Sequence, residues 1–290
     1  MWTGCLTALV TPFRRGEIDR EAVAALVEAQ IAAGVHGLVP AGSTGESATL
    51  SHEEHVELVR VVVTAARGRV PVIAGSGSNS TAEAVRLTRG AEEAGAQGAL
   101  LISPYYNRPT QEGIYRHYVA VAEATKLPLL VYNIPGRTAS NILPATLARL
   151  SRVPNIVGVK EASGSLGQVL EILGTAEPDF AVYAGDDNLT LPIMAAGGRG
   201  VISVTSNVAP RRMADLCEAL LADDLRGART IMHALLPLMQ ALFLEVNPIP
   251  VKTALAIMGR CVEEFRLPLT CLQAETRAQL ERVLREYDLV

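Results

Sequence analysis

Lys160 is the residue whose type and position point most directly to chemistry. The chain contains three lysines, Lys126, Lys160 and Lys252, among 26 basic residues. Lys160 ends the apolar run 156–159, and the strand ends of parallel α/β barrels carry their active sites. A desolvated lysine loses its proton more easily and can form an imine with a keto acid. The alternative is a lysine that pairs with Glu161 or another carboxylate at the barrel rim, and position alone leaves both interpretations open.

A turn of small and hydroxyl-bearing residues at 41–47 could bind an anion. Its glycines leave main-chain N–H groups and the hydroxyls of Ser43 and Thr44 accessible to a carboxylate. The alternative is an ordinary loop, because Gly-Ser-Thr-Gly turns are common.

Phenols follow two further apolar runs. Three of the seven tyrosines, Tyr105, Tyr106 and Tyr132, stand at these ends, where a phenol can relay protons. Arg137 comes shortly after Tyr132 and offers a planar guanidinium to a second carboxylate. In isolation, Arg137 could equally be a surface arginine in a turn.

Eight short apolar runs must position these side chains, and a helical pattern follows each of them. Uninterrupted apolar runs are typical of parallel strands that are buried on both faces. Capping boxes that begin at Ser51, Ser80 and Ser165 support the intervening helices. The pattern predicts an α/β fold, a (β/α)8 TIM barrel. The runs are 6–10, 37–41, 71–74, 99–103, 129–134, 156–160, 181–185 and 200–204.

Only helical patterns follow the eighth run. They cover 211–222, 225–243, 249–259 and 272–287, which is more than one closing helix requires. We therefore expect a barrel over 1–224 that carries the active site and a C-terminal helical extension over 225–290.

Composition excludes several classes of function. The chain has 290 residues, 49% of them hydrophobic, and a net charge of −4 without a basic run, which argues against nucleic-acid binding. Neither a signal-peptide pattern nor an apolar stretch of membrane-spanning length occurs. We expect a cytoplasmic protein without a membrane partner. The four cysteines lack zinc-ligand spacing and suit buried or incidental thiols.

Two motifs resemble cofactor or metal sites only superficially. Residues 75–80 have the start of a dinucleotide fingerprint, but Ser80 stands where the third glycine should be. In the string 52–55 the histidines are three apart, whereas a zincin helix needs them four apart. A metal-dependent aldolase is therefore disfavoured.

The motifs together identify a resemblance that runs over nearly the whole chain. The sequence resembles the pyruvate-dependent lyases and aldolases, the family that includes dihydrodipicolinate synthase and N-acetylneuraminate lyase. The motifs that carry it are Gly42-Ser43-Thr44-Gly45-Glu46-Ser47, Pro71-Val72-Ile73-Ala74-Gly75, Pro104-Tyr105-Tyr106-Asn107, Tyr132-Asn133-Ile134-Pro135-Gly136-Arg137-Thr138, Gly158-Val159-Lys160-Glu161 and Asn247-Pro248-Ile249-Pro250-Val251-Lys252.

The resemblance implies an activity that needs no metal and no organic cofactor. Lys160 would form a Schiff base with pyruvate, and the resulting enamine would attack L-aspartate 4-semialdehyde to give 4-hydroxy-tetrahydrodipicolinate in lysine (diaminopimelate) biosynthesis. Thr44, Tyr132 and Tyr106 would relay protons, with Tyr106 supplied by a neighbouring subunit of a homotetramer built as a dimer of dimers.

The substrate-binding residues follow from the same resemblance. Ser43 and Thr44 would hold the pyruvate carboxylate, Gly185 and Ile202 would line the pocket, and Arg137 would bind the semialdehyde carboxylate. Ser43 replaces the threonine that is usual in the synthases, as it does in the sialic acid lyases, whereas those lyases lack Arg137. Alternatives are therefore an N-acetylneuraminate lyase or 2-keto-3-deoxy-sugar-acid aldolase, or a catalytically silent barrel that binds a metabolite.

A regulatory site is a further expectation from the resemblance. Seven residues match the set that binds L-lysine as a feedback effector in lysine-sensitive members: Ser47, Ala48, His52, His55, Asn79, Glu83 and Tyr105. Single members also have ordinary explanations, since Glu83 could complete a capping box and the histidines could lie on an exposed helix face.

Overall fold

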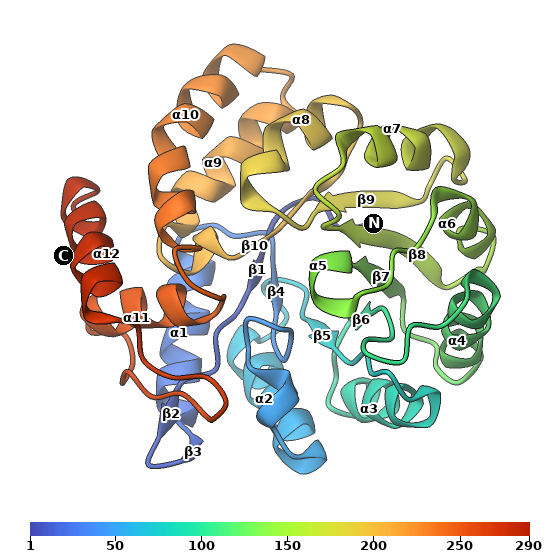
Figure 1. The fold of residues 1–290 in the computed structure, drawn as a ribbon, viewed down its shortest axis with the longest axis horizontal. Helices are drawn as coiled ribbons and strands as arrows, with labels where there is room; N and C mark the ends of the chain where they lie inside the picture. Colours follow the sequence, from blue (N-terminus) through green and yellow to red (C-terminus); the bar gives the residue numbers. More distant parts are fainter.

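The computed structural model describes residues 1–290 and contains the predicted barrel (Figure 1). Eight parallel strands run in the order β4-β1-β10-β9-β8-β7-β6-β5, and a parallel bridge between Leu38 and Val72 joins β4 to β5. The strands are β1 (Gly4–Ala8), β4 (Gly37–Val39), β5 (Ile73–Gly75), β6 (Gly98–Ile102), β7 (Leu129–Asn133), β8 (Ile156–Glu161), β9 (Ala181–Ala184) and β10 (Gly200–Ser203). All eight predicted runs are strands, with ends shifted by a few residues.

Helices form the outer layer around this barrel. They are α1 (Arg20–Ala32), α2 (His52–Ala66), α3 (Thr81–Glu93), α4 (Gln111–Glu123), α6 (Pro144–Leu150), α7 (Leu166–Thr175), α8 (Thr190–Ala195) and α9 (Pro210–Leu221). The four-residue α5 (Pro135–Thr138) lies inside this ring of helices (Figure 1). Short 3-10 turns follow three strands: η1 (Ser47–Thr49), η2 (Asp187–Leu189) and η3 (Thr205–Asn207). No helix is both long and apolar enough to cross a membrane.

The chain ends in the predicted helical extension, which covers one side of the barrel beside α1 and α9 (Figure 1). Its helices are α10 (Leu225–Ala241), α11 (Ile249–Ile257) and α12 (Ala274–Glu286). Buried apolar side chains of α10, such as Leu235 and Leu238, belong to the same core cluster as Leu216 of α9. The extension therefore shares a core with the barrel.

Apolar side chains also fill the barrel interior. Leu6, Ile73, Leu130 and Ile202 are fully buried and form a cluster with Tyr132, which lies near the end of β7. Strand residues alternate between the interior and the helix layer, so a continuous apolar run serves both faces. Tyr132 therefore joins the packed interior to the C-terminal end of the barrel.

The predicted helix caps were confirmed at two of three positions. Ser51 forms the predicted capping box with Glu54, and Ser165 caps α7 by accepting a hydrogen bond from the main-chain N–H of Gln168. Ser80 makes no side-chain cap. The hairpin of β2 (Phe13–Arg14) and β3 (Glu17–Ile18) was not predicted, because two-residue strands are too short to show periodicity.

Cysteine burial is uneven. Cys5 and Cys217 are buried, Cys261 is partly buried and Cys271 is exposed. All four are free thiols, so no covalent link stabilises the fold.

Candidate active site at the barrel mouth

Lys160 is buried at the end of β8, with 5% of its surface exposed. Burial lowers the pKa of its amine from 10.5 to about 8, although the nearby carboxylates of Asp187 and Asp186 favour the charged form. At pH 7 about one tenth of such amines are neutral, against about one in 3,000 at the ordinary pKa. The environment therefore favours the nucleophilic form.

The alternative partner of Lys160, Glu161, is engaged elsewhere. Its carboxylate accepts hydrogen bonds from Asn133 Nδ2 at 3.0 Å and from the main-chain N–H of Ser163 at 2.8 Å. No salt bridge joins Lys160 to Glu161 within the chain. The interpretation of Lys160 as a rim lysine paired with Glu161 is therefore wrong.

Tyr132 lies beside Lys160 because β7 and β8 pair these two residues in register. The Lys160 Nζ atom is 4.4 Å from the centroid of the Tyr132 ring. Burial and, to a smaller degree, the carboxylate of Asp186 raise the pKa of the Tyr132 phenol, while Arg137 and the nearby Ser43 hydroxyl lower it in part. The phenol stays protonated at neutral pH and can donate a proton.

Ser43 and Thr44 of the turn have different neighbours in the structure. The Ser43 hydroxyl lies near the Tyr132 phenol and lowers its pKa. The Thr44 hydroxyl instead accepts a hydrogen bond from Asn247 Nδ2 at 3.0 Å. The two adjacent residues of the turn thus contact different parts of the site, which residue types alone could not reveal.

A buried ion pair and a hydrogen bond fix the turn that carries Ser43 and Thr44. Glu46 has a left-handed φ of 55° and forms an ion pair of 2.7 Å with Lys252 of α11, and both side chains are fully buried. Thr11 Oγ1 also donates to the carbonyl oxygen of Gly45 at 2.7 Å. The turn is therefore anchored to β1's following loop and to the C-terminal extension.

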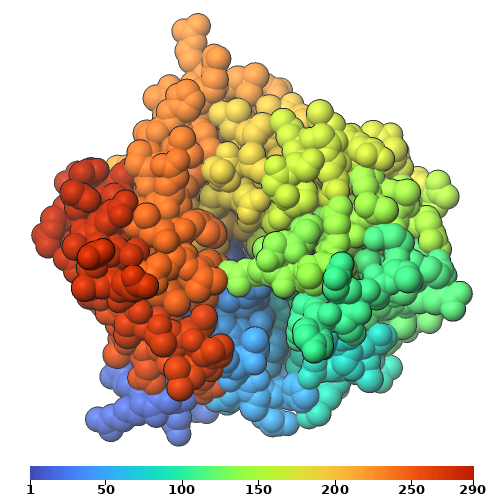
Figure 2. Space-filling model, in the orientation of Figure 1, coloured from blue at the N-terminus to red at the C-terminus, as the bar shows by residue number.

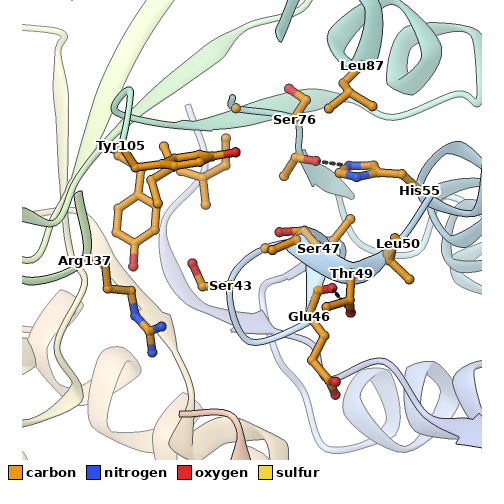
Figure 3. A pocket seen from close by; sticks show the side chains of 18 of the residues that line it. Ser43, Glu46, Ser47, Thr49, Leu50, His55, Ser76, Leu87, Tyr105 and Arg137 are labelled. Carbon is orange, nitrogen blue, oxygen red and sulfur yellow. Dashed lines mark hydrogen bonds between the residues drawn. The ribbon is translucent and has the colours of Figure 1, made fainter. Parts of the chain in front are cut away.

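A cavity of about 380 Å³ opens over this turn. Ser43, Tyr132, Arg137 and Asn247 line it, and Lys160 and Thr44 lie behind these residues, with Lys160 Nζ next to the ring of Tyr132. The surface is hollowed near the centre of this face, between the light-green segment around α5 and the orange C-terminal segment (Figure 2). Ser43 and Arg137 lie on the same side of the cavity, and the Glu46 side chain extends away from it (Figure 3).

Three predicted site residues lie apart from this group. Tyr106 is 89% exposed and has a φ of 71°, so it reaches none of the other catalytic residues of its own chain. Ile202 packs in the barrel interior, and Gly185 follows β9. Neither of these two lines the 380 Å³ cavity.

The predicted regulatory residues line the other side of the same cavity. Those that do so are Ser47, Ala48, His52, His55, Glu83 and Tyr105. Asn79 lies next to them and donates from its Nδ2 to the carbonyl oxygen of Tyr105 at 3.1 Å. Six of the seven predicted residues thus face one space with the catalytic turn.

Hydrogen bonds organise this regulatory set differently from the predicted pattern. His52 Nε2 is 2.6 Å from Glu83, and Ser78 donates to the same carboxylate, which lowers the Glu83 pKa. Glu83 therefore does not cap α3. His55 is buried rather than exposed and contacts the carbonyl oxygen of Gly75 at 2.6 Å (Figure 3). Burial lowers the pKa of His55, so it is neutral at neutral pH.

Sequence reasoning missed three groups at the site. The Glu46–Lys252 pair and Asn247 both lie in motifs that carried the resemblance, but nothing in the residue types indicates their contacts. Asp186 and Asp187 follow β9 directly, and two carboxylates at a strand end were a usable signal.

Comparison with known proteins identifies the family. The dihydrodipicolinate synthetase family model matches residues 1–287. A 4-hydroxy-tetrahydrodipicolinate synthase from Syntrophus aciditrophicus is 54% identical, covering 100% of both chains.

Solved structures agree with this match. A dihydrodipicolinate synthase from Acinetobacter baumannii complexed with pyruvate has a TM-score of 0.98 at 43% identity, covering 100% of both chains. One from Cyanidioschyzon merolae with lysine bound has a TM-score of 0.97 at 42% identity, covering 100% of this chain and 99% of that one. The chain belongs to the dihydrodipicolinate synthetase family.

Proposed function

We propose that this chain is a Schiff-base lyase that condenses pyruvate with L-aspartate 4-semialdehyde to 4-hydroxy-tetrahydrodipicolinate in lysine biosynthesis. The observation that carries the proposal is the buried Lys160 at the end of β8, whose pKa is lowered to about 8, in a member of this family. Its relatives carry the name of this synthase.

The first chemical step is imine formation. The neutral Lys160 amine attacks the keto carbon of pyruvate, and loss of one water gives the imine. Tyr132 can move protons during this step because its ring lies next to Lys160 Nζ and its phenol lies near the Ser43 hydroxyl. The main-chain amides and hydroxyls of Ser43 and Thr44 would hold the pyruvate carboxylate.

The second step forms the carbon–carbon bond. Loss of a methyl proton from the protonated imine gives an enamine, which attacks the aldehyde carbon of the semialdehyde. Arg137 points into the cavity and would pair with the carboxylate of this substrate. The substrate amine then displaces Lys160 from the imine carbon, which closes the ring and frees the enzyme. The imine is the electron sink, so these steps require no other group.

A coupled assay tests the choice of second substrate. We expect turnover of pyruvate with aspartate semialdehyde and none of sialic acid or a 2-keto-3-deoxy-sugar acid, because Arg137 matches a second carboxylate. Cleavage of a sugar acid without condensation would replace the proposed function by an aldolase. Inertness with every substrate would favour a silent metabolite-binding barrel.

We also propose that the active unit is an oligomer, a tetramer built from dimers. Tyr106 supports this because a large aromatic side chain that is 89% exposed suits burial against a second copy of the chain. Mixing inactive Lys160→Ala and Tyr106→Phe chains should restore activity, since one site of each mixed dimer has both intact groups. Failure of exchanged mixtures to regain activity would refute the shared site.

We further propose that L-lysine binds the regulatory set as an inhibitor. Glu83 is an anionic partner for an ammonium group, and a relative from this family has been crystallised with lysine bound. Calorimetry with L-lysine should give heat that Glu83→Gln removes. Absence of both heat and inhibition would sink the hypothesis.

We regard residues 1–224 as the barrel and 225–290 as an appended helical layer. Lys252 and Asn247 of that layer contact the catalytic turn, which supports a role for the layer in shaping the site.

A further inference from the structure

Asn247 joins the two carboxylate-binding parts of the site. It lies between α10 and α11 and is 6% exposed. Its side-chain Nδ2 donates to Thr44 Oγ1 at 3.0 Å, and its main-chain oxygen accepts a hydrogen bond from Arg137 Nη2 at 2.7 Å. One buried residue of the extension therefore contacts both the pyruvate turn and the arginine proposed for the second substrate.

The contact with Thr44 determines what that hydroxyl can do. A hydroxyl has one proton to donate and lone pairs to accept with. Thr44 Oγ1 accepts from Asn247, and no group of the chain accepts the Thr44 proton. Thr44 is 4% exposed, so its hydroxyl is shielded from hydrogen bonds with bulk water. The hydroxyl is thus kept as an unused donor at the anion-binding turn.

The other side-chain atom of Asn247 gives an independent observation. Its Oδ1 is buried and has no hydrogen-bond partner within the chain. The amide is therefore held through its Nδ2 contact alone. A buried amide oxygen without a partner is costly, and such costs are concentrated at functional sites.

We propose that Asn247 is a positioning residue that fixes the Thr44 hydroxyl as a hydrogen-bond donor to the pyruvate carboxylate, while its main-chain oxygen holds Arg137. This inference rests on the proposed function. The inference concerns the direction of one hydrogen bond. The Asn247 amide donates to Thr44, which leaves the Thr44 hydroxyl free to donate to the substrate.

Asn247→Asp reverses this direction with almost no change in shape. A carboxylate can only accept hydrogen bonds, so the Thr44 hydroxyl would donate to the new carboxylate instead of to the substrate. The carboxylate would also add negative charge beside an anionic substrate. The readout is the pyruvate concentration that half-saturates borohydride trapping on Lys160. We expect it to rise about ten-fold to hundred-fold, the range for losing a hydrogen bond to a charged group. Asn247→Leu, which removes the donor without reversing it, should raise it less, by about three-fold to ten-fold.

A double variant separates positioning from a general structural effect. In a Thr44→Val background the hydroxyl is absent, so Asn247→Leu should add little further weakening, and Asn247→Asp should weaken pyruvate trapping less than in the wild-type background because only its added charge remains. The semialdehyde KM should change less than the pyruvate KM, because the contact with Arg137 uses the main chain. Asn155→Asp is the matched control, since Asn155 donates to the main-chain oxygen of Ala122 at 2.9 Å just before β8, at the end opposite the mouth. It should leave pyruvate half-saturation unchanged.

Three results would overturn the inference. Unchanged half-saturation in a folded Asn247→Asp variant would mean that Thr44 donates to the amide oxygen. An undiminished effect in the Thr44→Val background would mean that Asn247 acts by another route. Should Asn247→Asp fail to fold, the same cycle with Asn247→Leu decides. Wild-type protein that traps no pyruvate would instead refute the proposed function and the inference with it.

Discussion

Replacing Lys252 with methionine should destabilise the protein by removing one partner of a buried ion pair. Lys252 and Glu46 are both fully buried, 2.7 Å apart, and Lys252 Nζ also lies 4.1 Å from the Phe13 ring centroid. Breaking such a pair typically costs 3–5 kcal/mol, because a buried charge remains without its partner. Glu46 keeps one weak contact, a hydrogen bond of 3.3 Å from the Arg266 main chain. We therefore expect a loss of about 3 kcal/mol.

Urea unfolding measures this loss as the change in the free energy of unfolding. The Glu46→Gln/Lys252→Met double variant should lose less than the sum of the single variants, since no unpaired charge remains. Arg152→Met is the matched control, because it breaks an ion pair with Glu177 whose side chains are 70% and 51% exposed. A loss below about 1 kcal/mol for Lys252→Met, or strict additivity in the double variant, would refute the reasoning.

Three further predictions concern the catalytic groups. The rate of pyruvate trapping should rise with pH, with a midpoint near pH 8, because Lys160 reacts only when neutral. Asp186→Asn should move the midpoint to lower pH, since Asp186 favours the charged amine, and an unmoved midpoint would contradict this. Arg137→Ala should lower kcat/KM for the semialdehyde about a hundred-fold and leave pyruvate trapping nearly intact; equal losses would refute the assigned role. Ser43→Ala should lower kcat more than the pyruvate affinity, because Ser43 lies near Tyr132, and Thr44→Val should do the reverse, as measured by steady-state kinetics. The opposite pattern would support the predicted role of Thr44 in the proton relay.

The barrel could be predicted from sequence because its signal is local. Each buried parallel strand is an apolar run such as 156–159, and the helices between the strands carry their own caps, as Ser51 does. Lys160 followed from the same signal, since its position at a strand end is written in the chain. The hairpin over 13–18 was missed because its two-residue strands are too short to show a hydrophobic periodicity.

What could not be predicted depends on contacts between distant segments. Asn247 meets Thr44 across 203 positions of sequence, and Lys252 meets Glu46 across 206. The neighbours Ser43 and Thr44 have similar hydroxyls, and only the backbone of the turn decides which of them meets Tyr132. Glu83 illustrates the same limit, because its spacing from Ser80 predicts a cap while His52 and Ser78 take its carboxylate in the fold.

Borohydride reduction in the presence of pyruvate tests the central claim most directly. The chain has three lysines, and Lys126 and Lys252 provide internal comparisons for peptide mapping by mass spectrometry. The account predicts a single three-carbon adduct on Lys160, which is absent without pyruvate and absent in Lys160→Ala. An unmodified Lys160, or an adduct on either other lysine alone, would contradict it.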